Sequence, residues 1–259
     1  MRILCLGDIF GKPGREAVRA LLPPLVKREG IDLVIANGEN AAGGVGLTPD
    51  TAQELLALGI DVLTGGNHIW KHKEIVPLLE TEPRVIRPLN YPEGTPGRGA
   101  GLFHTAAGTP VGVISVLGRV FMEPVPCPFG ASRRAADELR PQARVILVEI
   151  HAEATSEKRA LGWFLDGKVS AVYGTHTHVP TADEEVLPGG TGYISDLGMT
   201  GPYASVIGMR KEEVLQRFLT QRPTAWTAAK GDVRMCGALF DIDEESGKTR
   251  AVQRVRENM

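Results

Sequence analysis

The sequence predicts an α/β fold, and three features of the chain lead to that prediction. Short apolar runs alternate with segments of helical periodicity along the whole chain. The apolar runs lack the polar alternation of half-exposed strands, so we expect sheets that are covered on both faces. A length of 259 residues suits one large domain or two small ones, and no linker, repeat or low-complexity tract divides the chain. We therefore expect one domain over residues 1–259, with a small cap built from the Gly/Pro-rich middle or from the region after residue 200.

The N-terminal third alternates predicted strands with predicted helices. A turn over Gly7–Gly14 leads into a helix over Arg15–Glu29. Pro23 and Pro24 lie inside this helix, and they predict a kink or a break because proline lacks the backbone donor of a helical hydrogen bond. A second helix is expected over Thr48–Leu58, where a threonine N-cap precedes a proline. The strands of this third are expected at Arg2–Leu6, Asp32–Ala36 and Val62–Thr64.

The rest of the chain continues the same alternation. Residues 84–130 are rich in proline and glycine, and they contain short strands such as Val111–Val116. Further helices are expected at about Lys73–Leu79, at Ser132–Leu139, at Thr155–Phe164 and from Lys211 onward. Further strands are expected at Arg144–Ile150, Ala171–Tyr173, Glu184–Leu187 and Gly192–Ile194, with a last strand at Gly237–Asp241.

The composition argues against several classes of protein. Lys and Arg number 29 against 31 Asp and Glu, so a basic surface that coats nucleic acid is not expected. A metal site could still supply positive charge to a small phosphorylated substrate. The three cysteines are widely spaced, which excludes a disulfide framework and favours a reducing compartment. Without a leader-like segment or an apolar run near the roughly 20 residues of a membrane helix, we expect a cytoplasmic protein.

Metal-capable side chains follow five of the predicted strands. In α/β sheets, ligands bind beyond the carboxyl ends of the strands, so these side chains are expected to converge. Their mixture of carboxylate, amide oxygen and imidazole suits two hard or borderline divalent cations, and the lack of thiolates argues against a structural zinc site. Two ions roughly 3.5–4 Å apart can clamp a phosphate and activate a water molecule. The candidate residues are Asp8, Glu39, Asn40, Asn67, His68, His151, His176 and His178.

Each candidate also has an ordinary structural interpretation when it is taken alone. Asp8 could cap the helix that follows it, and Glu39 could lie in a solvated loop. His151 could belong to a polar surface turn. His176 and His178 are harder to explain in this way, because residues two apart on a strand face the same side. The recurrence of such residues at corresponding strand ends favours one shared metal site.

Several neighbouring residues receive less specific predictions. Cys5 lies within the first strand and is expected in the core. His72 is expected to be a solvated helix residue, and His104 an ordinary one. The glycine-rich stretch 43–46 lacks the spacing of a phosphate-binding loop and is expected to form a flexible loop near the site. The candidates for orienting the histidines are Glu153, Asp183 and Asp196, which the sequence does not rank.

Taken in order, the motifs GDIFG, NGEN, GGNH, HAEATSEK and GTHTHV resemble the YmdB-like branch of the calcineurin-like metallophosphoesterases. The resemblance extends from residue 1 to at least residue 210. It implies a β-sandwich flanked by helices in αββα layers. Phe10 stands where the broad superfamily has the histidine of its D-x-H motif, and Glu39 replaces the usual bridging aspartate, with Asn40 beside it. Both departures resemble those of the YmdB-like branch.

The resemblance also implies a division of the candidate residues between two metal ions. One ion would be held by Asp8, Glu39, Asn40 and His178, and the other by Glu39, Asn67, His151 and His176. His68 would stay off the metals, near the leaving group. The branch is associated with phosphodiesterase activity on cyclic nucleotides, notably 2′,3′-cyclic ones, and with iron-type metals; manganese and zinc remain alternatives.

The expected reaction is in-line attack on phosphorus by a metal-activated hydroxide, with His68 as general acid. A phosphomonoesterase with the same metal core and a non-catalytic regulatory or RNA-associated metal-binding protein are the alternatives, and a one-metal hydrolase is a third. The expected partner is a small phosphoester, with an RNA-related substrate and a homo-oligomer also considered. The sequence leaves the native metal and the physiological substrate open.

Overall fold

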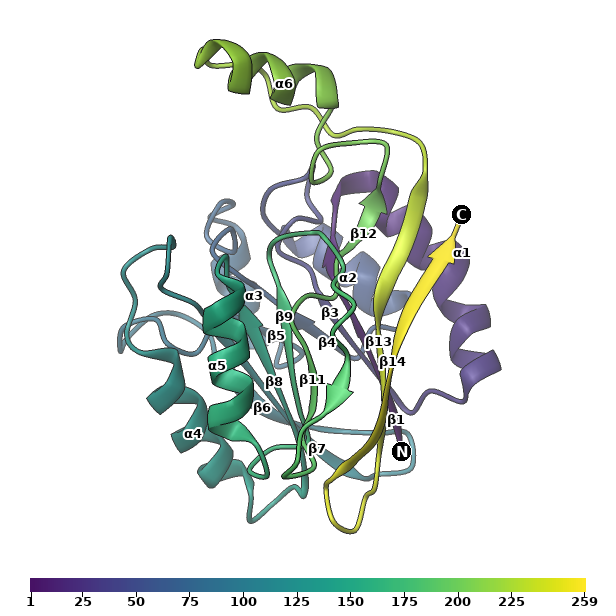
Figure 1. Ribbon diagram of the computed structural model, residues 1–259, viewed down its shortest axis with the longest axis vertical. Coiled ribbons are helices and arrows are strands. Elements are labelled where there is room, and N and C mark those ends of the chain that lie inside the picture. The colour runs from purple at the N-terminus through teal and green to yellow at the C-terminus, as the bar shows by residue number, and fades with distance from the viewer.

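The structure, a computed structural model that covers residues 1–259, consists of two facing β-sheets with helices on their outer faces (Figure 1). Helices α1, α2 and α3 pack on one sheet, and α4 and α5 pack on the other. The prediction of helix-covered sheets in αββα layers is confirmed. The helices are α1 (Gly11–Glu29), α2 (Pro49–Ala57), α3 (Ile75–Thr81), α4 (Pro128–Leu139), α5 (Thr155–Leu165) and α6 (Lys211–Thr220).

The first sheet has the order β2-β12-β13-β1-β3-β4-β5, and β14 pairs with β13 outside this path. Strands β1, β3, β4 and β5 run parallel, while β13 is antiparallel to β1. Its strands are β1 (Arg2–Leu6), β2 (Asp8–Ile9), β3 (Leu33–Asn37), β4 (Val62–Thr64), β5 (Val85–Ile86), β12 (Met199–Pro202), β13 (Val233–Ile242) and β14 (Thr249–Asn258).

The second sheet has the order β10-β11-β9-β8-β7-β6. Strands β7, β8, β9 and β11 are parallel, and β6 and β10 are antiparallel edge strands. Its strands are β6 (Ala100–His104), β7 (Pro110–Leu117), β8 (Val145–His151), β9 (Ala171–Thr175), β10 (Glu185–Val186) and β11 (Gly192–Ile194).

The inner faces of the two sheets form one buried apolar layer. Ile3 and Cys5 of β1 belong to the same buried cluster as Leu147 of β8 and Tyr173 of β9. Parallel strands that are covered on both faces need apolar side chains on both, which is why these runs show no polar alternation. The placement of Cys5 in the core is confirmed. No helix of the chain is long and apolar enough to span a lipid bilayer.

One prediction near the N-terminus is wrong, and a second is wrong in so far as it expected a break in the helix. The segment predicted as a turn contains strand β2, and α1 already begins at Gly11. Helix α1 also continues past Pro23 and Pro24 without a break. Both prolines are exposed, as are Arg19 and Ala20, whose carbonyl groups lose their helical partners. Water can therefore satisfy those carbonyl groups, and the packed opposite face of the helix keeps it continuous.

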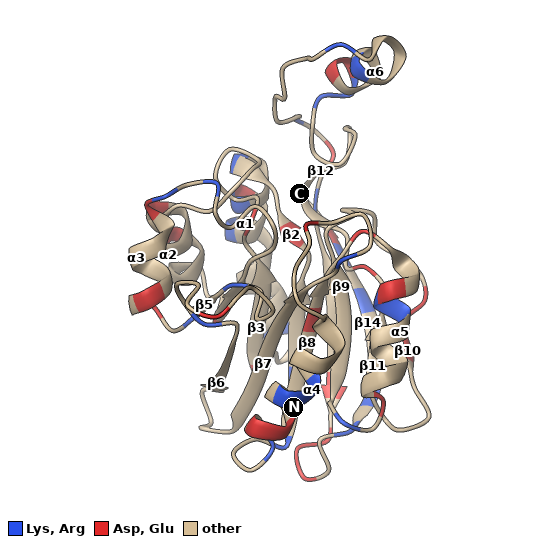
Figure 2. Ribbon diagram, turned by 90° about the vertical axis from the view of Figure 1, so that its left-hand side faces the viewer, with Lys and Arg blue, Asp and Glu red and all other residues tan.

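The Gly/Pro-rich middle of the chain is not a cap, because it supplies β6 and β7 to the second sheet. The expected last strand is longer than predicted, and β14 follows it as a further strand. The sequence missed β14 because one face is exposed and carries charged residues, which interrupt its apolar pattern. The segment between β12 and β13, which carries α6, projects from the rest of the chain (Figures 1 and 2). This segment lies in the region after residue 200, the other place where the sequence predicts a small cap.

Candidate metal and active site

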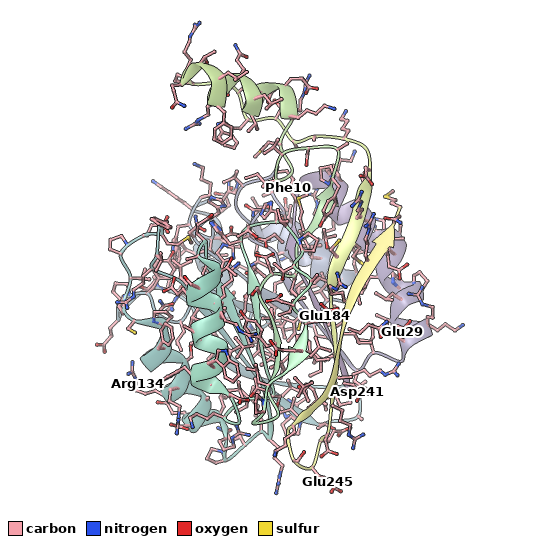
Figure 3. The ribbon with its side chains drawn as sticks, in the orientation of Figure 1. Phe10, Glu29, Arg134, Glu184, Asp241 and Glu245 are labelled. Atoms are coloured by element: carbon pink, nitrogen blue, oxygen red, sulfur yellow. The ribbon has the colours of Figure 1, made fainter.

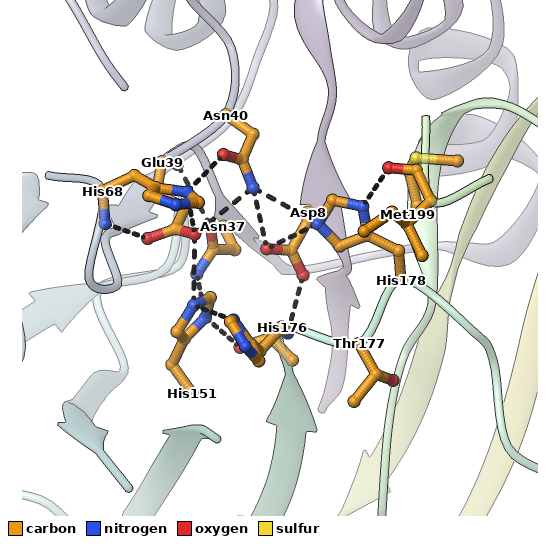
Figure 4. Close-up of polar contacts among 12 residues, drawn as sticks. Asp8, Asn37, Glu39, Asn40, His68, His151, His176, Thr177, His178 and Met199 are labelled. Carbon is orange, nitrogen blue, oxygen red and sulfur yellow. Dashed lines mark hydrogen bonds and ion pairs between the residues drawn. The ribbon is translucent and has the colours of Figure 1, made fainter. Parts of the chain in front are cut away.

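The candidate residues meet at one end of the two sheets, where five strands finish (Figure 4). Asp8 begins β2 directly after β1, and His151 is the last residue of β8. Residues 39 and 40 follow β3, residues 67 and 68 follow β4, and residues 176 and 178 follow β9. Because β8 and β9 belong to the second sheet, the site joins both sheets. The predicted convergence is therefore present in the structure.

One group of contacts surrounds the amide of Asn40. Its Nδ2 lies 3.4 Å from Asp8 Oδ1, 3.3 Å from Glu39 Oε1 and 3.3 Å from His178 Nε2. His178 Nε2 lies 3.5 Å from Asp8 Oδ1. All four side chains are buried. They are the set that the family resemblance assigns to one metal ion.

A second group of contacts surrounds His151. Its Nε2 lies 3.1 Å from Glu39 Oε1, 3.1 Å from Asn67 Oδ1 and 3.0 Å from His176 Nδ1. Ligand atoms of Glu39, His151 and His176 all lie within 4.8 Å of one another. Glu39 belongs to both groups, as a bridging carboxylate would.

These distances fit the donor set of a metal site. Ligand atoms bound at about 2.0–2.2 Å to one ion lie roughly 3.0–3.5 Å apart in tetrahedral or octahedral geometry. The contacts of His151 fall in this range. Asn40 points its Nδ2 toward the other candidates, so it could offer Oδ1 to a metal only after the amide turns over. Apart from that amide, the side chains present can hold metal ions where they stand.

The charges of the site perturb its ionisable groups. Burial alone would disfavour the charged form of His151, but the carboxylates of Glu39 and Asp8 outweigh it and raise the pKa of His151 to about 9. The pKa of Glu39 is held well below its usual range by His151 and His68, against the effect of burial. Burial and the neighbouring charge of His151 lower the pKa of His176 to about 3. His176 is therefore neutral at physiological pH, as a metal ligand must be, while His151 would release a proton on binding a metal.

The loop that carries His176 and His178 has an unusual backbone. Both residues have positive φ values, 96° and 65°, which non-glycine residues adopt at a cost in free energy. Asp196 Oδ2 accepts hydrogen bonds from the backbone N–H and the hydroxyl group of Thr177 between them, at 3.2 and 2.8 Å. Lys158 Nζ donates to the same oxygen at 2.6 Å and to the carbonyl oxygen of Thr175 at 2.8 Å. This buried ion pair ties the strained loop to α5.

A layer of polar groups behind the site orients His151. Its Nδ1 lies 2.9 Å from Thr175 Oγ1, which in turn donates to Glu149 Oε1 at 2.9 Å. Asn37 Nδ2 donates to the same carboxylate at 2.8 Å. Such partners fix which ring nitrogen faces a metal. The sequence did not indicate Glu149, because it lies inside the buried run Val145–Ile150, whose other residues are apolar.

The structure ranks the three acidic candidates that the sequence left unranked. Glu153 Oε2 lies 3.2 Å from His176 Nε2, on the opposite side of the ring from His151. Asp196 acts on the loop through Thr177. Asp183 instead accepts hydrogen bonds from Ser195, so it touches none of the candidate ligands.

Two interpretations of other residues change. Asp8 does not cap α1, because the N-cap residue is Phe10 and no side chain caps this helix. His72 is not a solvated helix residue, since it precedes α3 and its Nε2 lies 3.1 Å from the carbonyl oxygen of Val45. The loop that carries His72 contacts the loop that carries Val45, and this tertiary contact explains the position of His72. His104 is exposed at the end of β6.

A cavity of about 520 Å³ opens onto the candidate ligands. His68 reaches it with a side chain that is 37% exposed, whereas the side chain of Glu39 behind it is fully buried. His68 Nδ1 lies 2.9 Å from Asn40 Oδ1, and its backbone N–H donates to Glu39 Oε2 at 2.9 Å. The sequence placed the 43–46 stretch near the site, but it did not indicate the part of the wall formed by Ile207, Met209 and Trp226, which belong to no motif. The other lining residues include Phe10, Gly44, Val45, Lys71, Glu153, Ile207, Met209 and Trp226.

Phe10 occupies the position at which the broad superfamily has the histidine of its D-x-H motif. Its ring is buried and packs edge-on against His178, with centroids 5.7 Å apart. It forms a small buried cluster with Met199, Met209 and Val214. Figure 3 places it near the base of the α6 segment. The aromatic side chain therefore anchors this segment beside the site instead of binding a metal.

Gly66 leaves room for the ligands, and Gly66→Ala is expected to reduce metal binding. A Cβ atom at this position would lie 2.3 Å from Glu39 Oε2 and 2.4 Å from His151 Nε2. The backbone of Gly66 is not in the left-handed region, so steric overlap is the main effect. We expect metal affinity to fall by at least the roughly 10–100-fold that lost supporting contacts cost.

Elemental analysis and a metal titration of the Gly66→Ala variant measure this effect. Gly130→Ala is the control, because its Cβ would meet only the flexible Arg134 side chain, at 3.2 Å. Unchanged metal affinity in Gly66→Ala would show that the predicted ligands do not bind the metal in this arrangement.

Comparison with known proteins identifies relatives along the whole chain. Residues 4–255 match the family model described as YmdB-like protein. The chain is 44% identical over 255 residues to a Bacillus subtilis protein named 2′,3′-cyclic-nucleotide 2′-phosphodiesterase, covering 98% of this chain and 96% of that protein. It is 34% identical over 263 residues to a putative phosphatase/phosphodiesterase of Mycoplasma genitalium, covering 99% of this chain and 92% of the relative.

Solved structures give the same result. A hypothetical protein from Thermus thermophilus superposes with a TM-score of 0.91 at 47% identity, covering 100% of this chain and 99% of the other. A structure described as a novel phosphatase from Mycoplasma pneumoniae gives a TM-score of 0.93 at 31% identity, covering 100% and 93%. Family match, full-length relatives and shared fold agree, so this chain belongs to the YmdB-like protein family.

Proposed function

We propose that this protein is a metal-dependent phosphodiesterase that hydrolyses cyclic nucleotides, with 2′,3′-cyclic nucleotides as the preferred class. The observation that carries the proposal is the pair of donor groups that share Glu39 at the floor of one cavity. The full-length relationship to a protein named as a 2′,3′-cyclic-nucleotide phosphodiesterase supports this choice of substrate.

Two metal ions per chain are proposed, with iron preferred and manganese or zinc as alternatives. Asp8, Glu39, Asn40 and His178 would hold one ion, and Glu39, Asn67, His151 and His176 would hold the other. Metal ions there would lower the pKa of a water molecule and neutralise the phosphate oxygens. The one buried lysine nearby, Lys158, is paired with Asp196, so its charge is neutralised before it reaches the candidate ligands.

His68 is proposed as the general acid of the reaction. Its side chain reaches the cavity beside both donor groups, so it can face the leaving oxygen of a bound phosphodiester. Asn40 and Glu39 contact its Nδ1 and hold the ring in place. The proton on its outer nitrogen would pass to the ribose oxygen as the P–O bond breaks.

Phosphomonoester hydrolysis is the second candidate, because a Mycoplasma relative carries the name phosphatase/phosphodiesterase. The donor groups would serve either reaction, so the walls of the cavity decide between them. A non-catalytic regulatory role and a one-metal hydrolase stay alternatives from the sequence. A cytoplasmic location, a homo-oligomeric state, an RNA-related substrate and a single-domain organisation also stay predictions.

The deciding experiment is a phosphoester panel on protein whose metal content is known. Anaerobically purified protein is expected to contain two metals per chain and to turn over 2′,3′-cyclic nucleotides faster than 3′,5′-cyclic nucleotides or monoesters. Chelation should abolish turnover, and added iron or manganese should restore it. Faster turnover of monoesters would favour the phosphatase, and metal-loaded protein that hydrolyses no phosphoester would favour the regulatory role. Full activity at one metal per chain would favour the one-metal hydrolase.

A further inference from the structure

We infer that the α6 segment supplies a nucleobase-binding subsite to the cavity, with the indole of Trp226 as its stacking surface. This inference rests on the proposed phosphodiesterase function and specifies how that site would recognise its substrate. The subsite would select phosphodiesters that carry an aromatic base over those that do not.

The cavity is divided by polarity. Its floor is formed by carboxylate, amide and imidazole groups, including Glu39, His68 and His176. An apolar wall, defined here as Phe10, Val45, Ile207, Met209 and Trp226, lines the rest together with a few polar groups. A phosphate and two metal ions need only the floor. The wall offers apolar contact to a further part of the substrate, and the aromatic base is the apolar-faced part of a nucleotide.

Trp226 is the exposed aromatic member of the apolar wall. Its side chain is 49% exposed, whereas Phe10 and Met209 are buried. The Arg217 guanidinium lies over the ring, 5.1 Å from its centroid, so α6 supports the indole. A large exposed aromatic ring that lines a cavity can stack with any nucleobase, because every base has a π face.

The backbone that follows Trp226 is held in place. The Thr227 N–H donates to Glu213 Oε2 at 2.9 Å, and its carbonyl oxygen accepts from the Arg210 N–H at 2.9 Å. The Ala229 N–H donates to the carbonyl oxygen of Gly208 at 2.8 Å. These bonds connect the segment that follows Trp226 with the end of the loop that precedes α6, at Gly208 and Arg210, and with Glu213 of α6 itself.

The same loop is attached to the metal site. His178 Nδ1 lies 2.8 Å from the carbonyl oxygen of Ile207. A Cβ atom at Gly208 would lie 2.7 Å from the Phe10 ring, so loop and ring are in close contact. The base-binding wall and the candidate ligand His178 are therefore parts of one connected unit, which sets the distance between base and phosphate.

The inference predicts a change in substrate preference. In Trp226→Ala, the ratio of kcat/KM for 2′,3′-cyclic adenosine monophosphate to that for a base-free cyclic phosphodiester of glycerol should fall about tenfold, within the range that stacking on one base produces. Trp226→Phe should give an intermediate ratio, because it keeps a smaller aromatic surface. Trp163→Ala is the matched control. It is also half-exposed, at 50%, with an arginine over its ring, but it lies on α5 away from the cavity lining.

A binding measurement tests the subsite without turnover. Adenosine monophosphate should quench tryptophan fluorescence in the wild-type protein and in Trp163→Ala, and the quenching should be lost in Trp226→Ala. An unchanged substrate ratio, or equal quenching in Trp226→Ala, would overturn the inference. If the wild-type protein hydrolyses neither cyclic substrate, the proposed function fails, and the fluorescence titration still decides whether Trp226 binds a base.

Discussion

Replacing His68 with alanine is expected to lower kcat by about 10²–10⁴-fold, the usual contribution of a general acid, while the protein keeps its metals. The His68 side chain lies beside the two donor groups and lines the cavity, so the substitution removes the proposed proton donor. The bond from the His68 backbone to Glu39 remains in the variant, because it does not involve the ring. Metal content by elemental analysis and steady-state turnover measure the two expectations.

The nature of the leaving group sharpens this test. A nitrophenyl phosphodiester releases a weakly basic oxygen that needs little protonation, so His68→Ala should slow it far less than it slows a cyclic nucleotide. His104→Ala is the control, since His104 is exposed at the end of β6 and lies outside the cavity lining. Loss of metal from His68→Ala, or an equal loss of rate on both substrates, would contradict the role of acid.

Replacing Glu39 with glutamine should weaken both metal positions together. Glutamine keeps the size of the side chain and removes the negative charge that both donor groups share. Loss of the metals removes several kcal/mol of transition-state stabilisation, which corresponds to a fall in kcat of about 10³-fold. Metal titration and turnover of the same preparation measure the effect.

The pKa values of the site support this expectation. The pKa of Glu39 is held well below its usual range, so the side chain is a carboxylate at neutral pH. Glu74→Gln is the control, because Glu74 is exposed and contacts no candidate ligand. A Glu39→Gln variant that retains two metals and the wild-type rate would disprove the bridging assignment.

Much of the site could be predicted from the sequence because its residues follow short apolar strands. One apolar run, Arg2–Leu6, precedes Asp8, and another begins at Val145 and ends at His151. Both are local patterns of buried side chains. Parallel strands place their carboxyl ends at one edge, so the positions of these residues follow from the strand pattern. The choice of Glu39 as the shared ligand came from family resemblance, and the contacts in the structure agree with it.

Other features depended on contacts between distant parts of the chain. The helix through Pro23 and Pro24 stays continuous because its opposite face is packed. This packing cannot be predicted from the residues next to the prolines. Strand β14 was missed because its side chains are mostly exposed and charged, while its position is fixed by backbone pairing with β13. In both cases tertiary packing outweighs the local signal.

The sequence by itself determined the chemical character of this protein: which side chains can bind metal, and the strand ends at which they stand. The family resemblance implied how they are divided between two metals, and only the tertiary structure decided the contacts among them. The His176 N–H, for example, donates to Asp8 Oδ2 across 168 residues, a contact that depends on the two sheets facing each other. The tertiary structure also decided what surrounds the metal site. Phe10 of the apolar wall belongs to the GDIFG motif, but Ile207, Met209 and Trp226 come from segments without a motif. Side chains without periodicity are brought together only when the whole chain packs.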